Sequence, residues 1–462
     1  MRFTPHNYQR YCIERMVSEE ALGGFLDMGL GKTVITLTAI NELRYNRWAV
    51  ARCLVVAPKK VAEATWQNEA AKWDHLKHLR IVPVLGNVNK RIRALHTPGD
   101  IWVINRENVP WLAEYYRNSW PFDMVVLDES SSFKNPSSKR FKALRMVRPR
   151  IRRLIELTGT PAPNGLEDLW AQLYLLDGGQ RLGKTVSSFR ECFFVQDPSY
   201  PGQAYRTYSP QKGAEERIRA AIADICVSMK AEDYLELPEF ITHEIPVALD
   251  ANAEKAYKKL EREMLLEVDE QTITAGTAAV LNGKLLQLCS GAVYDANGEA
   301  VDIHACKLEA FMETVERLHG EHALVFYWFQ HELNRLLEAL AKTDLRVRVY
   351  YGPEDERDWN VGAVDLLLAH PACCGYGLNL QQGGHHAIWY TLPNWNLELL
   401  DQANRRLHRQ GQQFPVISHL LLVQGGMDED MAASLREKGN VQESMLRALR
   451  ARIERAKTGG GK

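Results

Sequence analysis

At 462 residues the chain exceeds one ordinary domain, and about two or three domains are expected. Its 45% hydrophobic and 25% charged residues are ordinary globular values, which excludes wholesale disorder. The 57 basic and 58 acidic residues give a net charge of -1, so any polyanionic partner must be held by local patches. No apolar run approaches the roughly 18 residues of a membrane-spanning helix, and the first residues lack the apolar centre of a signal peptide.

The eight cysteines show no CxxC pair and no zinc-like spacing, so they are expected to be reduced thiols in a cytoplasmic protein. Short apolar runs then alternate with longer helical patterns along the first half of the chain. The predicted strands there are Gly24–Leu26, Cys53–Ala57, Arg80–Leu85, Ile101–Asn105, Met124–Asp128 and Leu154–Leu157. Few charges and intervening helices are typical of parallel strands that are buried on both faces.

A second set of predicted strands follows after a mostly helical stretch, residues 166–318. These strands are Ala323–Phe329, Val347–Tyr351, Asp365–Ala369, Ala387–Thr391 and Val416–Val423. The turn-rich residues 196–213 are expected to form an exposed loop without regular structure. Residues 232–247 contain Pro238 and Pro246 and are expected to cross between two lobes. The pattern therefore predicts α/β lobes at 1–236 and 237–462.

The segment DMGLGKT, Asp27 to Thr33, follows a predicted strand and opens a helical pattern. Its glycines allow backbone N–H groups to face phosphate oxygens, and the helix N-terminus adds positive charge. Lys32 would reach the β- and γ-phosphates, while the Thr33 hydroxyl would hold Mg²⁺. The strict P-loop pattern is not met, because Leu26 stands at the position of its first glycine.

An acidic pair, Asp128 and Glu129 in MVVLDES, ends a later apolar strand. In phosphoryl transfer one carboxylate holds Mg²⁺ and another orients the attacking water. The sequence therefore assigns the metal to Asp128 and the water to Glu129. An isolated pair of this kind is more often a helix cap or a surface pair, and the neighbouring GKT segment favours the catalytic interpretation.

Three further segments complete a series: LTGTPAPN (157–164), CCGYGLNLQQGG (373–384) and QANRRLHRQGQ (402–412). In this order the motifs resemble those of the superfamily II helicases, and among them the Swi/Snf-type ATPases, in the short form found in bacteriophages and prophages. The resemblance covers about residues 8–412. It departs from the family at Ser131, where His is usual, at Asn404 and Arg405, and at Cys373 and Cys374, where small residues are common.

The resemblance implies two RecA-like lobes, each a mainly parallel sheet with helices on both faces, a helical insertion between the motif-bearing regions, and an ATP cleft between the lobes. The implied nucleotide-binding residues are Gln9, Met28, Gly29, Leu30, Gly31, Lys32, Thr33 and Gln402. The implied catalytic residues are Lys32, Glu129, Arg406 and Arg409. The two arginines, three residues apart, are expected on one helix face. The segment Thr158, Gly159 and Thr160 would couple the nucleotide state to lobe movement.

Nucleic-acid contacts are expected where strands end, because open α/β sheets bind ligands at the carboxyl ends of their strands. The expected contacts are Pro58, Lys59, Asn105, Arg106, Phe329, Gln330, Gly377, Leu378 and Asn379. Trp328 is expected in the core. Residues 139–153 hold eight basic side chains and no acid. They either line a groove for phosphates or cap the back of the first lobe.

The sequence thus predicts an ATP- and Mg²⁺-dependent translocase on DNA, duplex rather than single-stranded, with a possible recruiting protein and no membrane. In a phage it would work in the bacterial cytoplasm. A strand-separating DNA or RNA helicase, a motor subunit of a larger complex and a non-catalytic scaffold are the alternatives. The basic C-terminal pattern around Met445, Leu446, Leu449 and Ile453 would form a helix that docks on the second lobe or contacts DNA or a partner.

Overall fold

The computed structural model describes residues 1–162, 165–197, 208–234, 237–266, 275–295, 297–374, 378–436 and 452. They form two compact units, of which the first comprises residues 1–197 and 207–236 and the second begins at Leu237. Each unit has its own hydrophobic core. In the described part of the chain, none of the helices combines the length and apolar character that crossing a bilayer requires.

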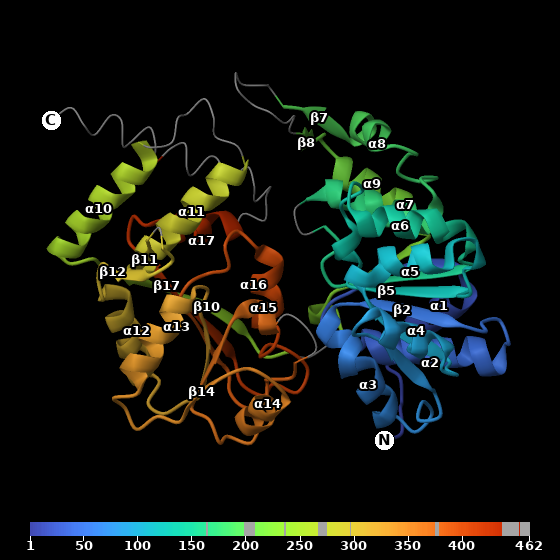
Figure 1. Ribbon diagram of the computed structural model, residues 1–462, viewed down its shortest axis with the longest axis horizontal. Coiled ribbons are helices and arrows are strands. Elements are labelled where there is room, and N and C mark those ends of the chain that lie inside the picture. The colour runs from blue at the N-terminus through green and yellow to red at the C-terminus, as the bar shows by residue number, and fades with distance from the viewer. Residues whose placement is uncertain are drawn as a thin grey trace. The chain divides into compact units, whose positions relative to one another are not determined.

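A seven-stranded sheet in the order β3-β4-β2-β5-β6-β1-β9 forms the centre of the first unit (Figure 1). Every pairing in it is parallel. The strands are β1 (Ala21–Leu26), β2 (Cys53–Ala57), β3 (Ile81–Val84), β4 (Ile101–Asn105), β5 (Met124–Asp128), β6 (Arg153–Thr158) and β9 (Cys226–Met229). The central strands β2, β4 and β5 are buried except at Asp128, which ends β5, as their mostly apolar, β-branched sequences predict.

Helices cover both faces of this sheet, with α1 to α3 on one side and α5 to α7 on the other (Figure 1). The helices of the unit are α1 (Asn7–Ser18), α2 (Lys32–Asn41), α3 (Trp66–Lys72), α4 (Val88–His96), α5 (Val109–Tyr116), α6 (Lys139–Val147), α7 (Leu169–Asp177), α8 (Val186–Phe193) and α9 (Ala214–Ile222). Alternate residues of β2 face opposite layers: Leu54 and Val56 pack with α5 to α7, whereas Val55 lies outside that cluster.

The second unit holds a six-stranded sheet in the order β10-β17-β16-β13-β15-β14, again with every pairing parallel. Its strands are β10 (Phe240–Val247), β13 (Ala323–Phe326), β14 (Val347–Val349), β15 (Leu366–Ala369), β16 (His386–Trp389) and β17 (Val416–Val423). Its helices are α10 (Ala251–Leu266), α11 (Ala275–Ser290), α12 (Cys306–Arg317), α13 (Gln330–Leu340), α14 (Pro353–Asn360), α15 (Pro371–Cys374), α16 (Leu397–Asn404) and α17 (Met427–Arg436). A separate antiparallel pair is formed by β11 (Ala292–Tyr294) and β12 (Ala300–Asp302).

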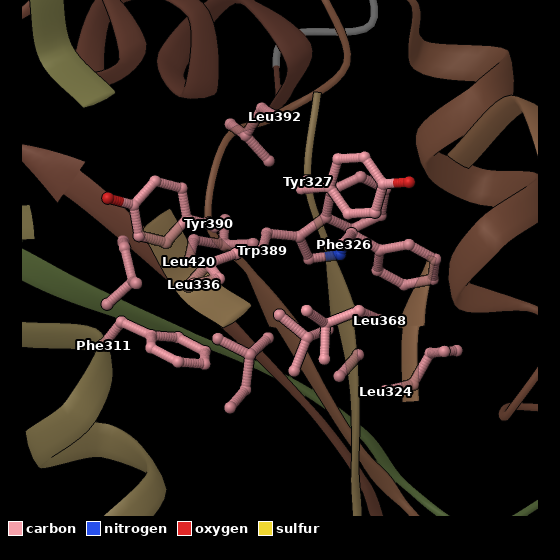
Figure 2. Packing of buried hydrophobic residues seen from close by; sticks show 14 of the residues in the cluster. Phe311, Leu324, Phe326, Tyr327, Leu336, Leu368, Trp389, Tyr390, Leu392 and Leu420 are labelled. Carbon is pink, nitrogen blue, oxygen red and sulfur yellow. The ribbon is translucent and has the colours of Figure 1, made fainter. Parts of the chain in front are cut away.

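Large aromatic side chains fill the core of the second unit (Figure 2). Phe326 on β13 and Trp389 on β16 stack with ring centroids 4.2 Å apart. Phe311 on α12 meets Tyr390 edge to face, with centroids 6.0 Å apart. The β13–β16 pairing sets Phe326 opposite Trp389 and so fixes the first contact.

Each strand predicted from the sequence is present. The described chain adds two edge strands to the large sheets, β9 and β10, and two separate antiparallel pairs that the prediction missed. The stretch 166–318 is mostly helical, but its strand β9 extends the first sheet. Part of the expected lobe crossing is strand β10, in which Pro246 pairs at the sheet edge with Leu422. Proline is tolerated there because an edge strand leaves one side unpaired.

The expected loop at residues 196–213 is flanked by regular structure, which corrects that part of the prediction. Strands β7 (Phe194–Gln196) and β8 (Tyr208–Pro210) pair antiparallel, with Phe194 opposite Pro210. The Gln211 side chain donates to the Phe194 carbonyl oxygen at 3.0 Å and closes the base of this hairpin. The turn-rich residues between the two strands, and all of the predicted C-terminal helix except Arg452, lie outside the described residues.

Candidate active site

Three segments singled out in the sequence follow neighbouring strands of the first sheet. The phosphate loop follows β1, the Thr158–Thr160 segment ends β6, and Asp128 ends β5, with β6 between the other two. The register sets Phe25 opposite Thr158 and Asp128 opposite Leu157. Because carboxyl ends of parallel strands share one edge, the sheet brings these segments together, as the sequence predicts.

The phosphate loop depends on two glycines with a left-handed backbone. Gly29 has φ of 90° and Gly31 has φ of 81°, values that residues other than glycine rarely adopt. Gly31 precedes the first residue of α2, Lys32, and its carbonyl oxygen accepts from the Ile35 N–H at 3.0 Å. The helix therefore begins at the end of the loop, where its free N–H groups can bind an anion. Leu30 is fully buried and anchors the loop.

Lys32 and Gln9 both face the phosphate loop. The Lys32 ammonium donates to the Leu26 carbonyl oxygen at 2.8 Å. The Gln9 amide donates to the Leu30 carbonyl oxygen at 3.3 Å and accepts from the His6 N–H at 3.0 Å. A Cβ on Gly31 would lie 2.8 Å from Gln9 Nε2, so the loop and Gln9 are in direct contact. Lys32 and Gln9 therefore both contact the phosphate loop, and their binding of nucleotide stays a prediction.

Asp128 is held by a tryptophan that sequence reasoning missed. Trp66, buried at the start of α3, donates from Nε1 to Asp128 Oδ2 at 3.1 Å. Burial raises the pKa of Asp128, against the opposing effects of the Trp66 hydrogen bond and the Lys32 charge. The influence of Lys32 shows that its ammonium and this carboxylate belong to one site.

Glu129 has an unusual backbone conformation for a non-glycine residue. Its φ is 57° and ψ is 62°, in the left-handed region, and 8% of the residue is exposed. Such a conformation costs on the order of 1–3 kcal/mol and persists only where the surroundings impose it. The short helix Ser130–Phe133 begins immediately afterwards, so the strained residue turns the chain sharply at the end of β5.

The third segment contacts the phosphate loop through Gly159. A Cβ on Gly159 would lie 3.4 Å from the Leu26 carbonyl oxygen and 3.6 Å from the Met28 nitrogen. The Thr158 hydroxyl accepts from the Thr160 N–H at 3.1 Å, which closes a tight turn at the strand end. Because the two segments are in close contact, a movement of one would displace the other.

The donor set in the first unit fits Mg²⁺. Magnesium prefers oxygen ligands, which the Thr33 hydroxyl and the Asp128 carboxylate supply. Burial disfavours the charge on Asp128, and a bound cation would offset that cost. When bound, the ion would neutralise charge on the phosphates.

The expected nucleic-acid contacts of the first unit follow β2 and β4 at the same sheet edge. Lys59 is exposed. Asn105 and Arg106, by contrast, hold a carboxylate that the prediction missed: Glu107 accepts from Asn105 Nδ2 at 2.9 Å and from Arg106 Nε at 3.0 Å. A nucleic acid phosphate would have to compete with Glu107 for these donors. Pro58 is buried and its carbonyl oxygen accepts from the Ala62 N–H at 2.9 Å.

The basic segment 139–153 is only partly a surface. Arg148 donates to the carbonyl oxygens of Ile151 at 2.8 Å and Leu176 at 2.9 Å. Arg153 is buried and donates to the Glu19 carbonyl oxygen at 2.8 Å. The interpretation as one groove of eight bases is therefore wrong for these two arginines, which stabilise the fold. The exposed bases are Lys139, Lys142, Arg145, Arg150 and Arg152.

In the second unit, Arg406 and Arg409 do not lie on one helix face, which corrects the prediction. Helix α16 ends at Asn404, and turns follow. The Asn404 side chain accepts from Trp389 Nε1 at 2.9 Å and is fixed to the sheet. The Gln412 amide donates to the Gln381 and Gly384 carbonyl oxygens at 3.1 and 3.0 Å. These tertiary contacts favour turns over a continued helix.

The two arginines still converge, because both donate to the Leu378 carbonyl oxygen. The distances are 3.3 Å from Arg406 and 2.9 Å from Arg409. The neighbouring Asn379 N–H donates to Glu356 Oε1 at 3.0 Å. Burial raises the pKa of Glu356, opposed by this hydrogen bond and by the Arg409 and Arg406 charges. Sequence reasoning missed Glu356, which lies on α14 and has no motif around it.

Gln402 is buried on α16 and donates to Glu398 Oε1 at 3.0 Å. Gly377 lies outside the described residues. Phe329 and Gln330 stand at the start of α13, and Gln330 is exposed. Trp328 was expected in the core, but it is only half-buried and stacks on His370, with ring centroids 4.9 Å apart.

Two parallel α/β units, the first with the glycine loop of residues 27–33, the acidic pair and the Thr158–Thr160 segment at one sheet edge, define a RecA-like, helicase-type architecture. A family model described as the SNF2-related domain matches residues 8–290. The chain is 35% identical over 460 residues to protein p41 of Acyrthosiphon pisum secondary endosymbiont phage 1, covering 97% of this chain and 99% of that protein. The chain belongs to the SNF2-related family.

More distant relatives are longer. An uncharacterized ATP-dependent helicase of Mycoplasma pneumoniae is 24% identical over 470 residues, which cover 95% of this chain and 42% of that protein. The chain therefore spans less than half the length of that relative. Among solved structures, the Sulfolobus solfataricus SWI2/SNF2 ATPase core in complex with dsDNA is 21% identical, with a TM-score of 0.45 and coverage of 98% of this chain and 97% of that one.

Proposed function

We propose that the chain is a DNA-dependent ATPase that uses ATP hydrolysis to move along duplex DNA. The observation that carries the proposal is the meeting of three loops at one sheet edge: the Lys32 phosphate loop, the Asp128–Glu129 pair and the Gly159 segment. The SNF2-related family and the helicase name of a relative support the same reaction class.

Within the first unit each residue has a defined task. Gln9 would read the adenine edge, since an amide both donates and accepts. The loop N–H groups and Lys32 would hold the phosphates, and Thr33 with Asp128 would hold Mg²⁺. Glu129 would orient the attacking water through its carboxylate. Its strained backbone supports this role, because strain of this kind clusters at active sites.

The second unit would complete the site with Gln402, Arg406 and Arg409, in a cleft between the two units. The arginines now share the Leu378 carbonyl oxygen, a neutral acceptor that phosphate oxygens would outcompete. When the arginines leave the Leu378 carbonyl oxygen for phosphate oxygens, the backbone at Leu378 and Asn379 would be released, so its position would depend on whether nucleotide is bound. Cycles of closing and opening would then move DNA gripped by both units.

DNA would lie against the strand-end residues of both units, Pro58, Lys59, Asn105, Arg106, Phe329, Gln330, Gly377, Leu378 and Asn379. Contacts of this kind go mainly to phosphates, so the motor would not depend on base sequence. The match to a phage protein over nearly its whole length supports action in the bacterial cytoplasm. A separate protein would recruit the motor to its DNA.

A strand-separating helicase is the second candidate, and the β7–β8 hairpin favours it, since unwinding requires a wedge. The experiment that tests both is steady-state ATP hydrolysis with duplex DNA, single-stranded DNA, RNA or no nucleic acid, with Glu129→Gln as the inactive control. The translocase predicts strong stimulation by duplex DNA and no unwinding of a forked duplex. Stimulation by single strands alone would favour the helicase, and no hydrolysis under any condition would contradict both.

A further inference from the structure

Gln172, on helix α7, is a fully buried polar residue outside all of the motifs. Its amide nitrogen donates to the Pro161 carbonyl oxygen at 2.6 Å and to the Asp168 carbonyl oxygen at 3.0 Å. Its amide oxygen accepts from the Ser130 hydroxyl at 2.9 Å. One side chain thus bonds to two different loops of the candidate active site.

The two loops carry the residues of the proposed reaction. Ser130 directly follows Glu129, and Pro161 directly follows Thr160. A second contact lies nearby, because the Lys134 ammonium is 3.4 Å from Asp168 Oδ2. The Glu129 loop is therefore bound to the Pro161 segment through Gln172 and to the start of α7 through Lys134.

A buried carboxyl group lies beside this connection. Glu156 on β6 is fully buried, and in the described part of the chain neither of its side-chain oxygens has a hydrogen-bond partner. Burial raises its pKa well above the ordinary value, and the neighbouring Ser130 and Arg148 offset only part of this effect. Polar groups in a core cost stability, so apolar residues here would give a more stable fold. Departures of this kind from apolar packing are expected at functional sites.

We propose that Gln172 is a positioning residue that couples the Pro161 loop to Glu129; this inference rests on the proposed function. The Gln172 amide is planar and rigid; it donates to the Pro161 carbonyl oxygen and accepts from the Ser130 hydroxyl. A displacement of the Thr158–Pro161 segment therefore pulls the Ser130 hydroxyl. Glu129 occupies a strained left-handed conformation next to Ser130. A small shift of Ser130 therefore changes the direction of the Glu129 carboxylate.

The test compares Gln172→Met with Gln67→Met in the full-length protein. Methionine keeps the length of the side chain and removes its hydrogen bonds. Gln67 is the control, because its half-buried side chain likewise donates from Nε2 to a backbone carbonyl oxygen, that of Ile81 at 3.1 Å, on the edge strand β3 of the same unit. Ser130→Ala is a second variant, which cuts only the Ser130 end of the connection and creates no large cavity.

Two readouts are measured for each variant. The first is hydrogen exchange, without nucleotide, of peptides covering residues 128–134 and 158–162. The second is the ratio of kcat with duplex DNA to kcat without it, alongside KM for ATP. We expect Gln172→Met and Ser130→Ala to raise exchange in the 128–134 peptide. We also expect them to lower the DNA stimulation ratio about fivefold to tenfold, the equivalent of one hydrogen bond, with KM nearly unchanged.

Unchanged hydrogen exchange of the 128–134 peptide in Gln172→Met would overturn the inference. Faster exchange with an unchanged DNA stimulation ratio would also overturn it, because Gln172 would then have only a structural role. An equal loss in Gln67→Met would overturn it too, since the effect would then be general destabilisation. Failure of the proposed function looks different: the wild-type protein itself would show no stimulation by DNA, and the inference would fall with it.

Discussion

The hydrogen bond from Trp66 to Asp128 gives the sharpest test of the first unit. Trp66→Phe keeps a large aromatic ring in the core and removes only the Nε1–H that reaches Asp128 Oδ2 at 3.1 Å. A hydrogen bond to a charged group contributes about 1.5–3 kcal/mol. Asp128 would lose that fixed orientation, and its ionised form would lose a stabilising donor. We therefore expect the Mg²⁺ concentration for half-maximal ATP hydrolysis to rise about tenfold to one hundredfold.

The assay is a Mg²⁺ titration of ATP hydrolysis at constant ATP, with thermal unfolding in the absence of Mg²⁺ as the fold check. Trp102→Phe is the control, because the buried Trp102 ring also donates through Nε1, to the Ala94 carbonyl oxygen at 3.2 Å. It should leave the Mg²⁺ dependence unchanged. A Trp66→Phe protein that is folded and whose Mg²⁺ dependence lies within about twofold of wild type would refute the assignment of Asp128 to the metal.

Three further predictions concern both units. Lys32→Ala should lower ATP hydrolysis by at least about a hundredfold, since the ammonium compensates phosphate charge; retained DNA-stimulated hydrolysis would show that the site is wrongly assigned. Burial lowers the pKa of His386 and of His419 from 6.5 to about 4. As the pH falls, both histidines therefore bind a proton in the unfolded chain before they do so in the folded chain. The free energy of unfolding of the second unit should therefore be highest above about pH 6.5 and should fall as the pH falls toward 4. Urea titrations that give the same free energy of unfolding at pH 7 and at pH 5 would contradict this. Lys307→Met should lower the free energy of unfolding by about 3–5 kcal/mol, because it leaves the buried Asp428, now 2.6 Å from the ammonium, without its partner. Adding Asp428→Asn should restore part of that loss in the same urea titration, and no loss in the single variant would disprove the argument.

The sequence was sufficient for the elements that local pattern and motif chemistry define. Buried strands such as β5 are apolar over Met124–Leu127, and the glycines at positions 29 and 31 are required by a left-handed backbone. Because parallel strands align their carboxyl ends, the motifs of Lys32, Asp128 and Gly159, each of which follows or ends a strand of one parallel sheet, share one edge.

Local pattern failed where a distant contact decides the conformation. The Arg406–Arg409 segment has helical spacing, yet α16 ends at Asn404, which Trp389 fixes to the sheet, and Gln412 binds the following turns to the loop before β16. The basic residues Arg148 and Arg153 looked like a phosphate surface, but they satisfy backbone carbonyl groups that only the folded unit exposes to them.

The sequence by itself determined the class of protein and the parallel α/β units, and it singled out the residues proposed to bind phosphate, because motifs and strand periodicity are local properties of the chain. Only the tertiary structure decided which side chains support those residues. Trp66 lies 62 positions from Asp128, and Gln172 lies 42 positions from Ser130. No local pattern encodes such pairs, since they arise when crossover connections bring distant segments to the same sheet edge.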